Sequence, residues 1–127
     1  MSVGRTKSLE LIRKSAKRLE FRIEKLPPGT TLVSAKWMLK ASAGDPDGSA
    51  LISKSVTLSA GPSGHVEDAG ASGTAKVAIQ IGSADLDAVV QNAGISSLKI
   101  ITSTGLASEI SETRLPVTIL PAVITGT

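Results

Sequence analysis

Two stretches of alternating apolar and polar residues, separated by Pro27-Pro28-Gly29, constrain the fold of this chain most. A period of two is typical of a half-buried β-strand, and proline ends a strand because it donates no ladder hydrogen bond. The sequence therefore predicts a strand, a turn and a second strand over residues 19–41. Their alternation assigns the following side chains to one apolar face: Leu19, Phe21, Ile23, Val33, Ala35, Trp37 and Leu39.

Aromatic residues are scarce, and this scarcity identifies the centre of the predicted core. Trp37 is the single tryptophan and Phe21 the single phenylalanine of 127 residues, and the chain contains no tyrosine. Aromatic side chains bury large apolar areas and dominate the energetics of small cores. We expect both residues to lie in the core, which alanine, valine, isoleucine and leucine must otherwise fill.

Further strands are predicted downstream, and three of their residues indicate irregularities. Lys54 interrupts the apolar face of the first of these strands, which favours an edge strand or a bulge. Ile110 is out of phase with the apolar residues that follow it, so we expect a bulge near Thr113. Pro116 favours a sheet edge or a kink. The predicted strands cover residues 51–59, 74–81, 97–102 and 106–120.

Two segments between these strands carry no strand pattern. Residues 60–73 are rich in glycine and polar side chains and predict a long loop. Residues 83–90 predict a single helical turn or a loop. The whole pattern of six or seven short strands with regular turn signals predicts an all-β chain, an antiparallel β-sandwich of the immunoglobulin-like type. A small β-barrel is the alternative.

Positive charge is concentrated near the N-terminus. Residues 1–25 carry eight basic and three acidic residues, although the formal charge of the whole chain is only +3. Apolar residues in this segment recur at roughly helical spacing, which predicts a short helix or an extended arm. We therefore divide the chain into a basic N-terminal arm (1–17), the sandwich (18–121) and a C-terminal tail (122–127).

The predicted arm is a candidate docking segment. Its few apolar groups cannot offset the entropy of ordering its backbone against its own domain. We expect the arm to become ordered on an acidic partner protein, and its deletion to leave the sandwich folded. A solvated terminus and nucleic-acid binding are the alternatives, although the arm has no aromatic residue for stacking on bases. The residues assigned to docking are Arg5, Lys7, Leu9, Ile12, Arg13, Lys14 and Lys17.

Residues with catalytic or metal-binding chemistry are few and isolated. The chain has no cysteine, and His65 is its single histidine. Residues 45–48 fit a β-turn better than a calcium loop, which needs further ligands at fixed spacing. Asp85 and Asp87 fit the start of a helical turn better than an acid–base pair. We predict no catalytic activity, no cofactor and no metal site, and no apolar run is long enough to span a membrane.

Three stretches of the chain resemble a group of short bacteriophage virion proteins with an immunoglobulin-like fold. They are the Leu-Pro-Pro-Gly-Thr-Thr turn with its Ser-Ala-x-Trp strand (26–37), the alternating strand after a Gly/Ser-rich middle (73–81), and the hairpin with a Thr-Ser-Thr-Gly tip (98–119). In that group the third part usually contains a tyrosine-rich strand, which this chain lacks. The resemblance implies a non-enzymatic component of the virion: a head decoration or fibre, or a neck or baseplate attachment protein.

The leading hypothesis is therefore a structural protein of the virion that docks on other virion proteins. We expect it to form a homo-oligomer or a symmetric multi-copy assembly. A carbohydrate- or surface-binding module is one alternative, but such sites display exposed aromatic residues and both aromatic residues here have core phases. A nucleic-acid-binding accessory protein that acts through the basic arm is the other. The sequence favours neither nucleic acid nor a membrane as a partner.

Overall fold

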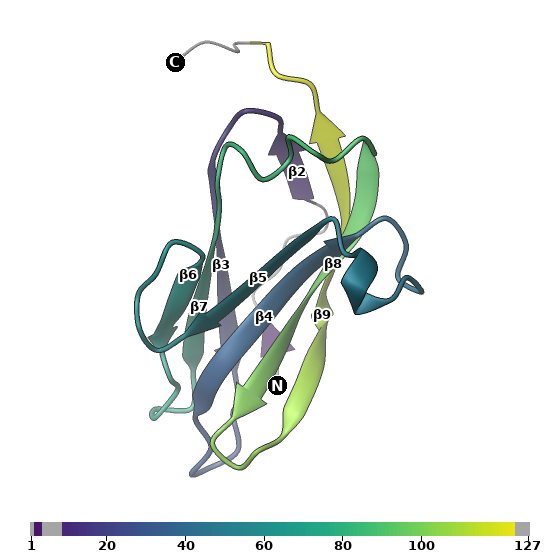
Figure 1. Cartoon of the computed structure of the whole chain (residues 1–127). Coiled ribbons are helices and arrows are strands. Elements are labelled where there is room, and N and C mark those ends of the chain that lie inside the picture. Colours follow the sequence, from purple (N-terminus) through teal and green to yellow (C-terminus); the bar gives the residue numbers. More distant parts are fainter. Residues whose placement is uncertain (1, 4–8, 124–127) are drawn as a thin grey trace.

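The computed structural model describes residues 2–3 and 9–123, which form nine strands and one short 3-10 helix, η1 (Asp47–Ser49) (Figure 1). The strands are packed as two facing sheets. Their bounds are β1 (Ser2–Val3), β2 (Leu9–Ile12), β3 (Lys17–Glu24), β4 (Leu32–Lys40), β5 (Ile52–Thr57), β6 (Gly64–Asp68), β7 (Ala75–Ile81), β8 (Ala93–Thr102) and β9 (Ala107–Leu120).

The order of the strands defines the fold. The first sheet has the order β1-β3-β7-β6, and the second has the order β2-β9-β8-β4-β5. Immunoglobulin sandwiches pair strands A, B, E and D in one sheet and C, F and G in the other, and variable-type domains add C′ beside C. Here β3, β4, β8 and β9 take the places of strands B, C, F and G, and β5 takes that of C′. The chain is an immunoglobulin-like β-sandwich.

The segment predicted as an arm or a short helix belongs to the sandwich over its described residues. β1 pairs antiparallel with β3, whereas β2 pairs in parallel with β9, a departure from the fully antiparallel arrangement expected. Leu9 and Leu11 are buried, at 5% and 1% exposure. The helical prediction is wrong for this segment because leucines two residues apart also fit a strand, and β9 supplies backbone partners. The predicted sandwich boundary at residue 18 is wrong for the same reason.

The predicted loop over residues 60–73 contains β6, at the edge of the first sheet. The strand is short and glycine-rich at its start, so its sequence shows little periodicity. Gly64 has a φ of 112°, and a Cβ atom there would lie 2.0 Å from the carbonyl oxygen of Ala78. Only glycine permits this close approach to β7. Val66 then contributes its side chain to the core.

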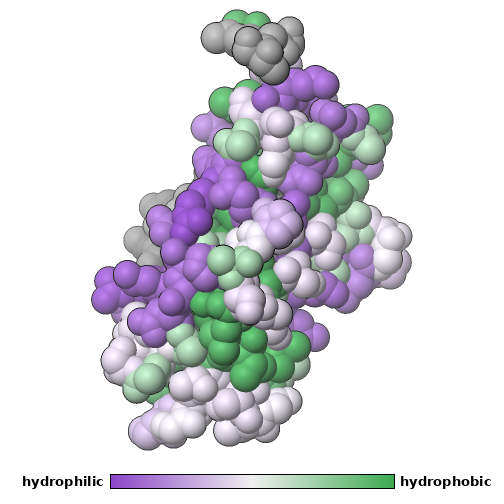
Figure 2. Space-filling view, turned by 60° about the vertical axis from the view of Figure 1, so that its left-hand side comes forward, coloured by the Kyte–Doolittle hydropathy of each residue, from purple (hydrophilic) through white to green (hydrophobic). Residues whose placement is uncertain are grey.

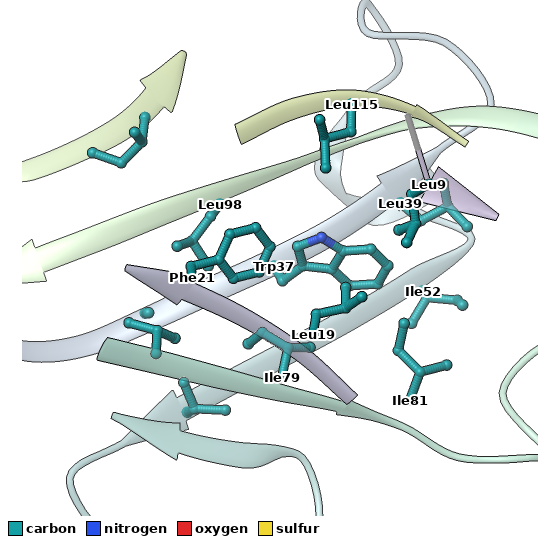
Figure 3. Packing of buried hydrophobic residues seen from close by; sticks show 14 of the residues in the cluster. Leu9, Leu19, Phe21, Trp37, Leu39, Ile52, Ile79, Ile81, Leu98 and Leu115 are labelled. Carbon is teal, nitrogen blue, oxygen red and sulfur yellow. The ribbon is translucent and has the colours of Figure 1, made fainter. Parts of the chain in front are cut away.

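Trp37 lies at the centre of the core, with no exposed surface. Figure 3 shows its indole beside Phe21 from β3 and near Leu98 from β8, so that side chains of both sheets meet there. Phe21 is 7% exposed and Leu98 is fully buried. The prediction that both aromatic residues lie in the core is confirmed. No hydrogen-bond partner for the indole nitrogen of Trp37 exists among the described residues.

Two irregularities adjust which side chains face the core. The pairing of β4 with β8 shifts register between Leu32 and Ser34. As a result, Leu32 is buried and Val33 is exposed, so the inward position predicted for Val33 is wrong. The bulge predicted near Thr113 is confirmed, since β8 and β9 shift register between residues 110 and 115. There the Thr113 hydroxyl accepts a hydrogen bond from the Leu98 amide at 2.8 Å.

Three further segments were predicted from the sequence: the strand of Lys54, the strand of Pro116 and the segment over residues 83–90. β5 is an edge strand of the second sheet, as Lys54 predicts. The edge position expected for the segment of Pro116 is wrong for β9 as a whole, because β9 lies between β2 and β8. Pro116 itself pairs with Ile95 of β8, and the described pairing with β2 begins at Val117. The segment over residues 83–90 forms successive turns rather than a regular helix, and its Leu86 and Val89 are buried. Residues 124–127 of the predicted tail lie outside the described residues.

Replacing Trp37 tests the packing of the core. We expect Trp37→Ala to lower the free energy of unfolding by about 3–5 kcal/mol, because deletion of a buried aromatic side chain leaves a cavity. Trp37→Phe removes less volume and also removes the unpaired indole N–H, so its loss should be clearly smaller. Urea denaturation of the purified variants measures both values. A loss below about 1 kcal/mol for the alanine variant would contradict the observed burial.

Leu11 and Ile12 are neighbours in β2 with opposite burial, and they form a matched pair of test sites. Leu11 is 1% exposed and Ile12 is 46% exposed. We expect Leu11→Ala to cost about 2–5 kcal/mol and Ile12→Ala less than about 1 kcal/mol. Equal and small losses in thermal or chemical denaturation would show that β2 is dispensable.

The deletion of residues 1–17, expected from the sequence to leave the sandwich folded, should now destabilise the sandwich.

Candidate functional site

Most of the described residues that were assigned to docking are buried or contact other parts of this chain. Arg5 and Lys7 lie outside the described residues. Leu9 is buried in the core, whereas Ile12 is half exposed on β2. The ammonium group of Lys17 donates a hydrogen bond to the Glu10 carbonyl at 3.2 Å. The described positions among them therefore do not form a continuous exposed docking surface.

Arg13 connects the turn between β2 and β3 to the turns that follow β7. Its guanidinium donates hydrogen bonds to the carbonyl oxygens of Leu86, at 3.1 Å, of Val89, and of Gln91, at 2.8 Å. Lys14 has a φ of 67° and forms an ion pair with Asp87 at 3.3 Å. Carbonyl groups at the ends of tight turns lack strand partners, and a planar guanidinium satisfies several of them at once. The role of Arg13 is structural.

The other residues with candidate chemistry are separated from one another. His65 lies half-buried on β6. The turn predicted over residues 45–48 overlaps a turn in which the Asp45 amide donates to the Ser42 carbonyl at 3.1 Å, and the 3-10 helix η1 that follows it. Asp85 and Asp87 have different lysine partners. Within residues 2–3 and 9–123 no three His, Asp or Glu side chains converge on a point that could hold a metal ion. No described helix is long and apolar enough to cross a membrane.

Asp85 and Lys54 form an ion pair between the turn after β7 and the edge strand β5. Their oxygen and nitrogen atoms are 2.8 Å apart, and the side chains are 25% and 15% exposed. The Gly82 amide donates a second hydrogen bond to the Asp85 carboxylate at 2.6 Å. Burial raises the pKa of Asp85, but the hydrogen bonds from Lys54 and Gly82 and the charge of Lys54 outweigh it and lower that pKa below 3.8.

The outer face of the second sheet is a candidate site. Strand register aligns its outward side chains in three cross-strand rows. From the β8–β9 hairpin end onward these are Thr57, Ser34, Ile101 and Ala107; then Ser55, Lys36, Lys99 and Glu109; then Ser53, Met38 and Ser97. A shallow hollow of about 310 Å³ opens on this face. Met38, Ile95 and Ser97 contribute to its lining, and Lys36, Lys40, Lys99 and Arg114 bring positive charge to it.

Positive potential on this face acts on the carboxylate at its border. Asp47 lies 2.7 Å from the ammonium of Lys40. The hydrogen bond and the charge of Lys40 lower the pKa of the Asp47 carboxyl, and the charges of Lys36 and Lys99 act in the same direction. Arg114 forms an ion pair with Glu109 at 3.0 Å. The sequence shows which residues of each strand point outward, but not that β4 and β8 are neighbours, so it could not reveal this site.

Comparisons with known proteins give a structural similarity but no match in sequence. No family model matches the chain, and no curated protein sequence matches it. Among solved structures, a structure of murine CRIg is similar with a TM-score of 0.45 and 12% sequence identity, covering 95% of this chain and 97% of that chain. The immunoglobulin-like assignment follows from the strand order of the two sheets.

The ion pair of Asp85 predicts a pH-dependent contribution to stability. Because the pKa of Asp85 is lower in the folded chain, its carboxylate stabilises the fold above the unfolded pKa of about 3.9. This contribution is lost as the pH falls through the folded pKa. We expect Asp85→Asn to cost about 1–3 kcal/mol at neutral pH, because Lys54 loses its charged partner. The difference from the wild type should shrink below about pH 4.

Chemical denaturation at a series of pH values measures this difference. Asp87→Asn is the matched control, because its ion pair with Lys14 is about half exposed on both sides. The control should have a much smaller effect at neutral pH. A stability difference for Asp85→Asn that is independent of pH would contradict the assigned role of the carboxylate.

Proposed function

We propose that this chain is a non-enzymatic structural protein of a bacteriophage virion that docks on other virion proteins. The single observation that carries docking is the outer face of the second sheet, which combines a hollow, unbalanced positive charge and exposed apolar side chains. The virion location is supported by the resemblance of the turn, strand and hairpin motifs described above. The immunoglobulin-like sandwich supplies a rigid frame for such a face.

The placement of ionisable groups supports a structural role. Asp85 pairs with Lys54, Asp87 with Lys14, and Glu67 with Arg18 at 2.7 Å. Each of these carboxylates stabilises a junction between strands or turns. General acid–base catalysis requires such groups to reach a reacting atom in a shared cavity. These side chains are instead committed to contacts within the fold.

The two alternative functions have less support. Phe21 and Trp37 are both buried, so neither can stack on a sugar ring or a base. Arg13, Lys14 and Arg18 contact carbonyl or carboxylate groups of this chain, which reduces the charge available to a nucleic acid. A docking protein needs neither exposed aromatic residues nor a basic arm.

Analysis of purified particles tests the proposed function. We expect quantitative mass spectrometry to find the chain in density-gradient-purified particles of the phage that encodes it, in several copies per particle. A symmetric multi-copy assembly requires a simple ratio to another structural protein. A chain that is absent from the particles and present in the lysate only as a free monomer would overturn the proposal.

A further inference from the structure

Two lysines lie directly opposite each other on the outer face of the second sheet. Lys36 on β4 pairs in register with Lys99 on β8. Directly opposite residues on antiparallel strands have Cβ atoms about 4.5–5.5 Å apart, and like charges in this arrangement destabilise the sheet. The free chain therefore carries an unfavourable contact on the outer face of its second sheet.

The described carboxylates of this face, Asp47 and Glu109, form their ion pairs with other residues. Among the described side chains, no carboxylate lies within ion-pair distance of Lys36 or Lys99. Glu109 is opposite Lys99 in register, but it forms an ion pair with Arg114, and Asp47 is bound by Lys40. Both lysine side chains are exposed, so an anionic group from outside can reach them.

The first sheet provides an instructive contrast. There Arg22 lies opposite Lys76, which is also a pair of like charges. However, Asp68 is in register with Lys76 on its other side, and Glu24 lies 3.4 Å from Arg22. In both sheets a carboxylate lies in register with one member of the pair, Asp68 with Lys76 and Glu109 with Lys99. The difference is that Arg22 forms an ion pair with Glu24, whereas neither Lys36 nor Lys99 forms one among the described side chains.

Exposed apolar side chains lie beside the lysine pair. Val33 on β4, Leu58 after β5, and Ile101 on β8 are 41%, 53% and 40% exposed. Ser34 pairs in register with both Thr57 and Ile101, and Val33 and Leu58 are the chain neighbours of Ser34 and Thr57. The three apolar residues therefore lie near the same end of the sheet. Figure 2 brings the side of the molecule with β5 and β6 forward and shows an apolar patch on its lower half, below hydrophilic side chains. A contiguous apolar patch beside charged residues is typical of a protein interaction site.

We propose that the outer face of the second sheet binds an acidic, partly apolar segment of a partner protein, with a carboxylate held between Lys36 and Lys99. Apolar side chains of the same segment cover Val33, Leu58 and Ile101. This inference specifies the partner chemistry of the docking face and rests on the proposed function. A second copy of this chain is a poor occupant, since a two-fold axis through the lysine pair would bring four ammonium groups together.

Peptide titration followed by NMR tests the partner chemistry. The probe is a short blocked peptide in which aspartate alternates with valine, and a peptide with lysine in place of aspartate is the control. We expect the acidic peptide to shift backbone amide signals of β4 and β8, and added salt to weaken its binding. Shifts confined to another surface, no shifts, or equal binding of the basic peptide would overturn the proposal.

Charge-removing variants identify the residues responsible. We expect the double variant K36Q/K99Q to bind the acidic peptide at least about tenfold more weakly, and K76Q, from the first sheet, to bind it as the wild type does. The double variant should also melt about 1–3 °C higher at low salt, because the like-charge contact is removed. A lower melting temperature, or equal loss of binding in K76Q, would contradict the inference.

Incorporation into particles separates this inference from the proposed function. If the wild type and K36Q/K99Q are incorporated equally, the chain is a virion protein but the lysine pair does not dock it. If the wild type is absent from particles and still binds the acidic peptide through Lys36 and Lys99, the site stands and the virion role fails. Loss of incorporation in K36Q/K99Q alone, with K76Q incorporated normally, supports both.

Discussion

The packing of Trp37 between the sheets is the interaction on which the rest of the structure depends. In antibody domains, a disulfide between strands B and F lies beside the tryptophan of strand C. This chain has no cysteine, and Phe21 of β3 and Leu98 of β8 lie near the indole instead (Figure 3). A covalent link between the sheets is thus replaced by hydrophobic burial, which requires close packing because cavities are costly. The aliphatic residues around Trp37 consequently tolerate little change in volume.

A second constraint is the closure of the sandwich by the N-terminal segment. The chain pairs first with the first sheet through β1 and then with the second through β2, before it enters β3. Arg13 lies between β2 and β3, and it fixes this part of the chain by donating hydrogen bonds to three carbonyl groups of the turns after β7. Much of the described basic charge near the N-terminus therefore has a structural explanation. Consequently, the docking surface that we propose lies on the outer face of the second sheet rather than on an arm.

The sequence predicts those features that depend on local periodicity. The strands around Phe21 and Trp37, the bulge near Thr113 and the edge position of β5 follow from side-chain alternation and from single interruptions of it. The sequence does not predict β6, because a strand that begins at Gly64 has little periodicity. It does not predict β2 either, because the leucines of β2 also fit a helix. The candidate docking face lies beyond local reasoning altogether, since Lys36 and Lys99 are brought together only by the order of strands in the sheet.

The lysine pair places two like charges in register, and neither lysine forms an ion pair among the described side chains. Arg22 and Lys76 are also like charges in register, but there Arg22 forms an ion pair with Glu24. A local violation of this kind reduces stability, and such violations tend to occur where a surface has a function. Repulsion in the free chain also strengthens the selectivity of the face, because an acidic partner relieves it and a basic one increases it. The same two charges therefore weaken the isolated domain and favour its assembly with an acidic partner.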